Sequence, residues 1–106
     1  MPKYLLHASY TEEGLKGLLK EGGSKRREAL EQAVKGLGGT LETFYYAFGE
    51  TDVFTIADLP DNVSSTALSL IINSAGTATV KTTVLITPQE VDQATKKSVD
   101  YRPPGR

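Results

Sequence analysis

The chain has 106 residues, of which 39% are apolar and 24% charged, and a formal net charge of −1. Its length suits one domain, and the balance of apolar and charged residues excludes an intrinsically disordered chain. No apolar stretch approaches the roughly 18 residues of a membrane span, and the net charge provides no overall basic field for non-specific nucleic-acid binding.

Residues 4–10 are rich in strand-forming side chains and predict a first β-strand. Thr11 predicts the N-cap of a helix, and Ser24 predicts the N-cap of a second helical segment after the Gly22-Gly23 pair. Apolar stripes at helical spacing follow both caps. They consist of Leu15, Leu18 and Leu19 in the first segment, and of Leu30, Ala33, Val34 and Leu37 in the second. Gly38 and Gly39 predict the end of the second helix, because glycine adopts the left-handed conformation without steric cost.

Residues 41–48 and 52–59 predict two strands joined by a short hairpin turn at residues 49–51. Pairing Phe48 with Asp52 places Phe44, Tyr46 and Phe54 on one face of the hairpin and Tyr45 on the other. In this register both faces are largely apolar or aromatic.

The C-terminal part begins with a helix that Asp61 or Asn62 caps and Gly76 ends. The apolar residues between 67 and 72 cover more than one face, so we expect this helix to be buried on several sides. A β-branched strand follows at residues 78–86. Thr87, Pro88 and Glu90 then form a strong signal for the start of a last, short helix.

The order of these elements is β-α-β-β-α-β with an extra C-terminal helix, which predicts an α+β fold of the ferredoxin-like type with a four-stranded antiparallel sheet. We expect one domain over residues 1–98 and a tail over residues 99–106. Helices cover one face of such a sheet. Because the other face also looks apolar, we expect two sheets to pack face to face in a homodimer or a multiple of dimers.

Several segments resemble the GYD domain family, over roughly residues 3–95. They are Tyr4–Leu6, Ser9–Thr11, Gly14–Leu18, Phe48–Val53, Asp58–Asp61, Val80–Thr83 and Leu85–Pro88. The motif that gives the family its name is Gly-Tyr-Asp. The corresponding stretch, residues 49–52, matches its glycine and aspartate and has no tyrosine. The resemblance implies a fold of the dimeric α/β-barrel superfamily, which includes small-molecule monooxygenases, lactone isomerases, dehydratases and proteins without known activity.

His7 and Asp52 are the candidate catalytic residues. His7 is the only histidine, and its side chain can act as general acid or base near neutral pH; its alternative role is that of a half-buried strand residue. Asp52 can orient such a base, or it can cap the neighbouring turn. With one histidine and no cysteine, we expect no metal site and no other bound cofactor.

Lysine and arginine side chains are the candidate ligands for an anion. Lys81 lies in the middle of a predicted strand, where it can pair with a carboxylate, neutralise a ligand or protect a sheet edge. Lys25, Arg26 and Arg27 follow a helix cap, where the helix dipole disfavours cations. They can bind a carboxylate or phosphate, or they can pair with glutamates as Lys25–Glu28 and Arg27–Glu31.

Tyr10 and Tyr46 are candidates for lining a cavity between the sheet and its helices, although strand tyrosines are more often core or interface residues. Three functions remain open. The protein is a homo-oligomeric small-molecule-binding or structural domain, a small cofactor-independent or haem-assisted enzyme like a monooxygenase or lactone isomerase, or a regulatory anion-binding module. The expected partners are a second copy and a small hydrophobic or anionic ligand, with no nucleic acid and no membrane. Because the chain has no cysteine and residues 1–4 lack a signal-peptide pattern, we expect a cytoplasmic protein.

Overall fold

The computed structural model describes residues 1–106 and contains one four-stranded antiparallel sheet. Its strands are β1 (Lys3–Tyr10), β2 (Thr40–Tyr46), β3 (Val53–Asp58) and β4 (Ala78–Leu85). They lie in the order β2-β3-β1-β4, so β1 and β3 are central and β2 and β4 form the edges. This α+β architecture is compatible with the predicted ferredoxin-like fold.

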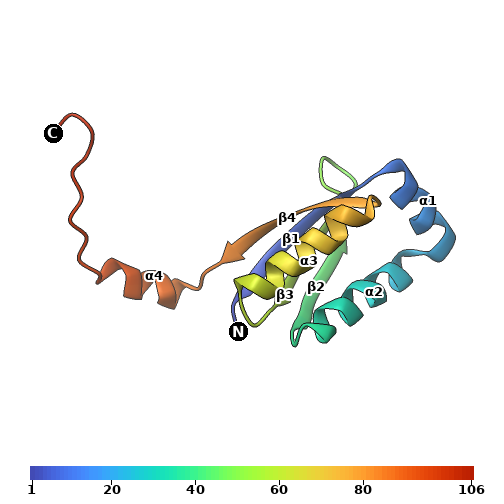
Figure 1. Ribbon diagram of the computed structural model, residues 1–106, viewed down its shortest axis with the longest axis horizontal. Helices are drawn as coiled ribbons and strands as arrows, with labels where there is room; N and C mark the ends of the chain where they lie inside the picture. Colours follow the sequence, from blue (N-terminus) through green and yellow to red (C-terminus); the bar gives the residue numbers. More distant parts are fainter.

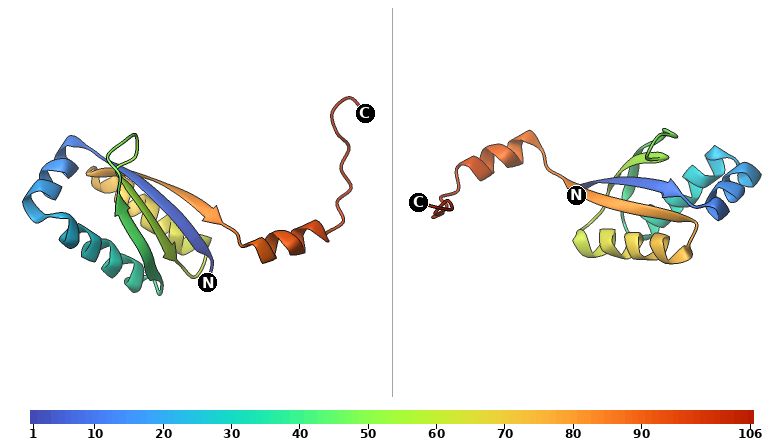
Figure 2. Two further views of the ribbon diagram at one scale, coloured as in Figure 1. Left: turned by 180° about the vertical axis from the view of Figure 1, so that it is seen from behind. Right: turned by 90° about the horizontal axis from the view of Figure 1, so that it is seen from above.

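Four helices accompany the sheet: α1 (Glu12–Glu21), α2 (Gly23–Gly36), α3 (Asn62–Ala75) and α4 (Pro88–Thr95). Both α2 and α3 cover the same face of the sheet, and α1 lies at the end of the sheet where β1 finishes (Figures 1 and 2). The opposite face carries no helix. None of the helices has the length and hydrophobicity that crossing a bilayer requires.

Side-chain caps start three of the helices, as the sequence predicts. Thr11 accepts a hydrogen bond from Gly14 N, and Asp61 accepts one from Ser64 N. Thr87 and Glu90 form a complete capping box at α4. The prediction for Ser24 was wrong: α2 already begins at Gly23, directly after Gly22, and has no side-chain cap.

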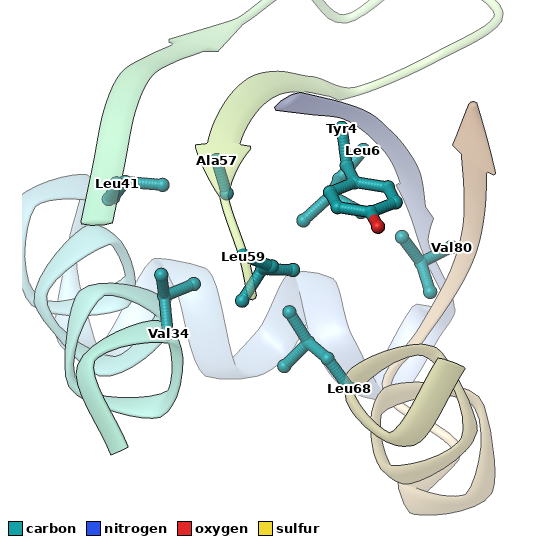
Figure 3. Close-up of a cluster of buried hydrophobic side chains, with 8 residues drawn as sticks. All are labelled: Tyr4, Leu6, Val34, Leu41, Ala57, Leu59, Leu68 and Val80. Atoms are coloured by element: carbon teal, nitrogen blue, oxygen red, sulfur yellow. The ribbon is translucent and has the colours of Figure 1, made fainter. Parts of the chain in front are cut away.

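The core lies between the helix-covered face of the sheet and the two helices. Val34 of α2 and Leu68 of α3 approach Leu59, Tyr4 and the sheet from below in Figure 3. Eight buried side chains form this cluster. They are Tyr4, Leu6, Val34, Leu41, Ala57, Leu59, Leu68 and Val80.

The hairpin register differs from the predicted one by one residue. Tyr46 pairs with Val53 and Tyr45 with Phe54, and a β-bulge lies between Leu41 and Thr43. Strand β2 ends at Tyr46 and β3 begins at Val53, so the connection is longer than predicted and covers residues 47–52. Phe48 adopts a positive φ of 52° in this connection. As a result Phe44 and Tyr46 face the helices together with Val53, whereas Tyr45 and Phe54 share the open face.

The outer side of α3 is more exposed than the sequence predicted. Val63, Leu70 and Ile71 are exposed, so α3 is not buried on several sides.

Residues 86–102, including all of α4, form an exposed C-terminal arm that stands away from the body (Figures 1 and 2). This arm explains the radius of gyration of 17.0 Å, since a compact chain of this length has about 13 Å.

Candidate functional site

An apolar groove separates α2 from α3, and the helix-facing side of the sheet forms its floor. Its volume is about 240 Å³. Because pockets of this composition commonly hold small molecules, we treat it as the candidate site. The sheet contributes Ala8, Tyr10, Phe44, Val53 and Ala78; α2 contributes Arg26, Ala29, Leu30 and Ala33; α3 and its C-terminal turn contribute Leu68, Ile71, Ile72, Ala75 and Thr77.

Two tyrosines and one arginine meet at the end of the groove where β1 and β2 finish. Tyr10 and Arg26 line it directly, and the hydroxyl of Tyr46 donates a hydrogen bond to the carbonyl oxygen of Gly23 at 3.0 Å. A side chain at position 23 would place its Cβ 3.0 Å from the Tyr46 ring, so the glycine permits this close approach. The sequence-predicted residues Tyr10, Tyr46 and Arg26 are thus brought together.

Burial raises the pKa of Tyr46 to about 12, and the nearby phenol of Tyr10 acts in the same direction. The guanidinium of Arg26 opposes this shift through its positive charge. Tyr46 is therefore a neutral phenol throughout the physiological range. Its proton is engaged by the carbonyl oxygen of Gly23.

Arg26 lines both the groove and a second cavity of about 140 Å³ under α1. On that second side Glu21 Oε2 accepts a hydrogen bond from Arg26 Nη1 at 3.3 Å. Its neighbours in sequence point elsewhere. Arg27 pairs with Glu31 at 3.6 Å, as predicted, whereas the predicted Lys25–Glu28 pair does not form, and neither cation lines the groove.

His7 lies on the open face of the sheet, away from the groove. Its ring stacks on Phe54 with 6.2 Å between the ring centroids and 13° between the planes. Lys81 is opposite His7 on the neighbouring strand β4. The structure therefore groups His7, Lys81 and Phe54 on one surface and Tyr10, Tyr46 and Arg26 on the other.

Asp52 holds the end of β1 in place. Its carboxylate Oδ2 accepts a hydrogen bond from the backbone N of Tyr10 at 2.8 Å, and its own backbone N donates to Ala8 O at 2.9 Å. The carboxylate thus bonds the backbone of β1, and not the neighbouring turn that the sequence suggested it could cap. Asp52 thereby positions Tyr10, which lines the groove.

The match to a family model covers residues 4–95 and carries the description GYD domain. The chain belongs to the GYD domain family. No curated protein and no solved structure matches it. The match begins at the second residue of β1 and ends with α4, so it includes both walls and the floor of the groove.

The walls of the groove in this GYD domain were not predicted as site residues. Ala29 and Ala33 on α2 face Ile71 and Ile72 on α3 across the opening. The available signal was the spacing of Arg26, Ala29 and Ala33, since positions three and four apart share one side of a helix. Small residues on that side leave space in front of the arginine.

A polar cluster lies at the far end of the open face. Lys3 Nζ contacts Glu42 Oε2 at 2.6 Å and Asp58 Oδ1 at 3.0 Å. The hydrogen bonds to Glu42 and Asp58 raise the pKa of Lys3. No group of three or more histidine, aspartate or glutamate side chains of this GYD domain is arranged to hold a metal ion.

Proposed function

We propose that this GYD domain is a homo-oligomeric domain that binds a small, mainly apolar molecule in the groove between α2 and α3. The observation that carries the proposal is the groove itself, with a volume of about 240 Å³ and walls that are almost entirely apolar. A cavity of about 150 Å³ lined by apolar side chains is enough to bind benzene. The volume therefore suits a molecule with one ring and a short substituent.

Binding fits the lining better than the catalytic arrangement considered from the sequence. The polar side chains at the groove are Tyr10, Arg26 and Thr77. His7 lies on the opposite side of the sheet, and the Asp52 carboxylate is engaged by Tyr10 N. A base at His7 oriented by Asp52 thus has no contact with the groove, whereas shape, an apolar lining and one cation are the ordinary means of ligand recognition.

Native mass spectrometry of protein purified from the cells that make it tests this function. We expect a discrete retained mass on the wild type and its loss from Ala33→Trp, because the new indole fills the groove from α2. Gln32→Trp is the matched control, since Gln32 is exposed on the same helix and does not line the groove. Retention of the same mass by Ala33→Trp, or its loss from Gln32→Trp alone, contradicts the proposal.

The oligomer in this proposal is a dimer of the α/β-barrel type, in which a second copy covers the open face of the sheet. Leu5, Tyr45, Phe54 and Ile56 supply apolar surface there. Tyr45 is 70% exposed and Phe54 41% exposed in the single chain. Burying such a face against a symmetric copy removes apolar surface from water. The lack of cysteine supports a cytoplasmic location for this assembly.

A further inference from the structure

Arg26 is the one charged side chain among the residues that line the groove. Apart from Tyr10 and Thr77, the side chains that line the groove with it are apolar. A cation at an apolar wall loses part of its hydration, so it favours a negatively charged partner. The fold places this cation at the end of a space that is otherwise suited to an apolar body.

The guanidinium of Arg26 has N–H groups that can donate hydrogen bonds to such a partner. It carries five N–H groups, and Glu21 is the only protein acceptor within hydrogen-bond distance of it. That contact involves Nη1 alone, at 3.3 Å, and lies on the side of the second cavity. A planar carboxylate on the groove side can therefore accept from the remaining N–H groups.

We infer that the groove binds a small apolar monocarboxylate, with its carboxylate on Arg26 and its apolar body between Ala33 and Ile71. This inference rests on the proposed function, whose ligand class it specifies. Tyr10 lines the same groove as Arg26, and its hydroxyl can donate to the second carboxylate oxygen. Phe44 and Val53 on the floor contact the apolar body.

The charge of the site favours a monoanion over a phosphate dianion. Arg26 is a single cation, and Glu21 already offsets part of its charge. The two neighbouring cations are not available, because Lys25 and Arg27 do not line the groove and Arg27 pairs with Glu31. The size limit is that of the groove, about 240 Å³, which accommodates one ring with a short acidic side chain.

Calorimetric titration with phenylacetate and phenylacetamide tests the inference, because the two compounds share shape and differ in charge. We expect the wild-type protein to bind phenylacetate at least about tenfold more tightly, as a charge-assisted hydrogen bond provides. Arg26→Gln should remove this preference while the amide still binds. Arg26→Lys should retain part of it, because the charge remains without the planar pair of donors.

Two further variants separate the groove from the rest of the charged surface. Arg27→Gln is the matched control: it removes a cation from the next position of the same helix, and the preference for phenylacetate should be unchanged. Glu21→Gln should strengthen phenylacetate binding, since it frees Arg26 from its competing carboxylate.

The possible results test the carboxylate assignment separately from the groove as a binding site. Equal binding of the acid and the amide to the wild type, or an unchanged preference in Arg26→Gln, overturns the carboxylate assignment alone and leaves a groove for neutral molecules. Tighter binding of phenylphosphonate than of phenylacetate overturns the monoanion. If neither compound binds and the groove instead receives α4 of a second copy, detected by cross-linking position 91 to position 33, the proposed function fails together with the inference.

Discussion

Tyr46 links the edge of the sheet to the first turn of α2. Its hydroxyl donates to Gly23 O at 3.0 Å, and its ring lies edge-on to Phe44 with 5.1 Å between centroids. The hydrogen bond needs the protonated phenol, and both contacts need one fixed rotamer. The side chain thus sets the distance between β2 and α2 at the end of the groove where Arg26 lies.

Replacing Tyr46 with phenylalanine should change how the stability depends on alkaline pH. The pKa of Tyr46 is raised from 10.0 to about 12 in the folded protein. A raised pKa means that the fold favours the protonated phenol, so the stabilisation is complete below pH 10 and is lost as the pH rises through about 12. At neutral pH Tyr46→Phe should cost about 0.5–1.5 kcal/mol of unfolding free energy for the lost hydrogen bond.

Urea unfolding of both proteins over this pH range measures the effect. The difference between the wild type and Tyr46→Phe should shrink as the pH rises above 10, because the wild type loses a contribution that the variant never had. A constant difference in unfolding free energy over the whole pH range would show that the pKa of Tyr46 is the same in the folded and the unfolded protein.

Helix α1 depends on a glycine at one position and tolerates a side chain at another. Gly14 is buried, and a Cβ there would lie 1.8 Å from Thr77 O, which already accepts a hydrogen bond from Thr11 N. Gly17, on the same helix, has no neighbouring atom within 4 Å of its Cβ position. The contact of α1 with the start of β4 therefore passes through Gly14.

Gly14→Ala and Gly17→Ala should change stability in opposite directions. Gly14→Ala forces α1 away from Thr77 and should lower the unfolding free energy by about 1–3 kcal/mol, as overpacking does. Gly17→Ala should raise the unfolding free energy by about 0.5–1 kcal/mol, because alanine is the better helix former. Thermal and urea unfolding of the two variants measure these changes. A stable Gly14→Ala protein would contradict the close approach of α1 to the sheet.

The sequence predicted those elements whose start depends on local chemistry. Thr11, Asp61 and Thr87 each bind a backbone N–H three residues later, so the caps could be recognised from the residue types alone. The hairpin register was wrong because residues 47–52, rather than a turn at residues 49–51, connect the two strands, with Ala47 N donating to Asp52 O. The bulge between Leu41 and Thr43 lies at the other end of this strand pair. The alternation of side chains does not indicate this longer connection, in which Phe48 adopts a positive φ.

The groove could not be predicted, because it depends on the spacing between α2 and α3 rather than on either helix. Ala29 and Ala33 fit an ordinary helix–helix contact equally well. In the folded chain Val34 and Leu68 pack toward the sheet from the two helices (Figure 3), and the groove remains between α2 and α3. The tyrosines and Arg26 were recognised as candidates, but their convergence on this space is a property of the assembled fold.

The whole molecule has two unpartnered apolar surfaces on opposite sides of one sheet. Alternation of side chains separates them: Ala8, Phe44 and Val53 face the groove, whereas His7, Tyr45 and Phe54 face the open side. A partner on the open face leaves the groove accessible. Dimer formation and ligand binding are therefore separable properties in the proposed function.

Phe54→Glu should convert the proposed dimer to a monomer without emptying the groove. A carboxylate in the middle of the open face would have to be desolvated by the partner, a cost that exceeds what pairing with Lys81 returns. Light scattering coupled to size exclusion should report a monomer, and native mass spectrometry should still detect the retained ligand mass on it. Thr66→Glu, on the exposed side of α3, is the control and should remain dimeric. A wild-type protein that is already monomeric contradicts the proposed dimer, whereas ligand loss from a folded Phe54→Glu monomer would show that the two faces are coupled through the sheet.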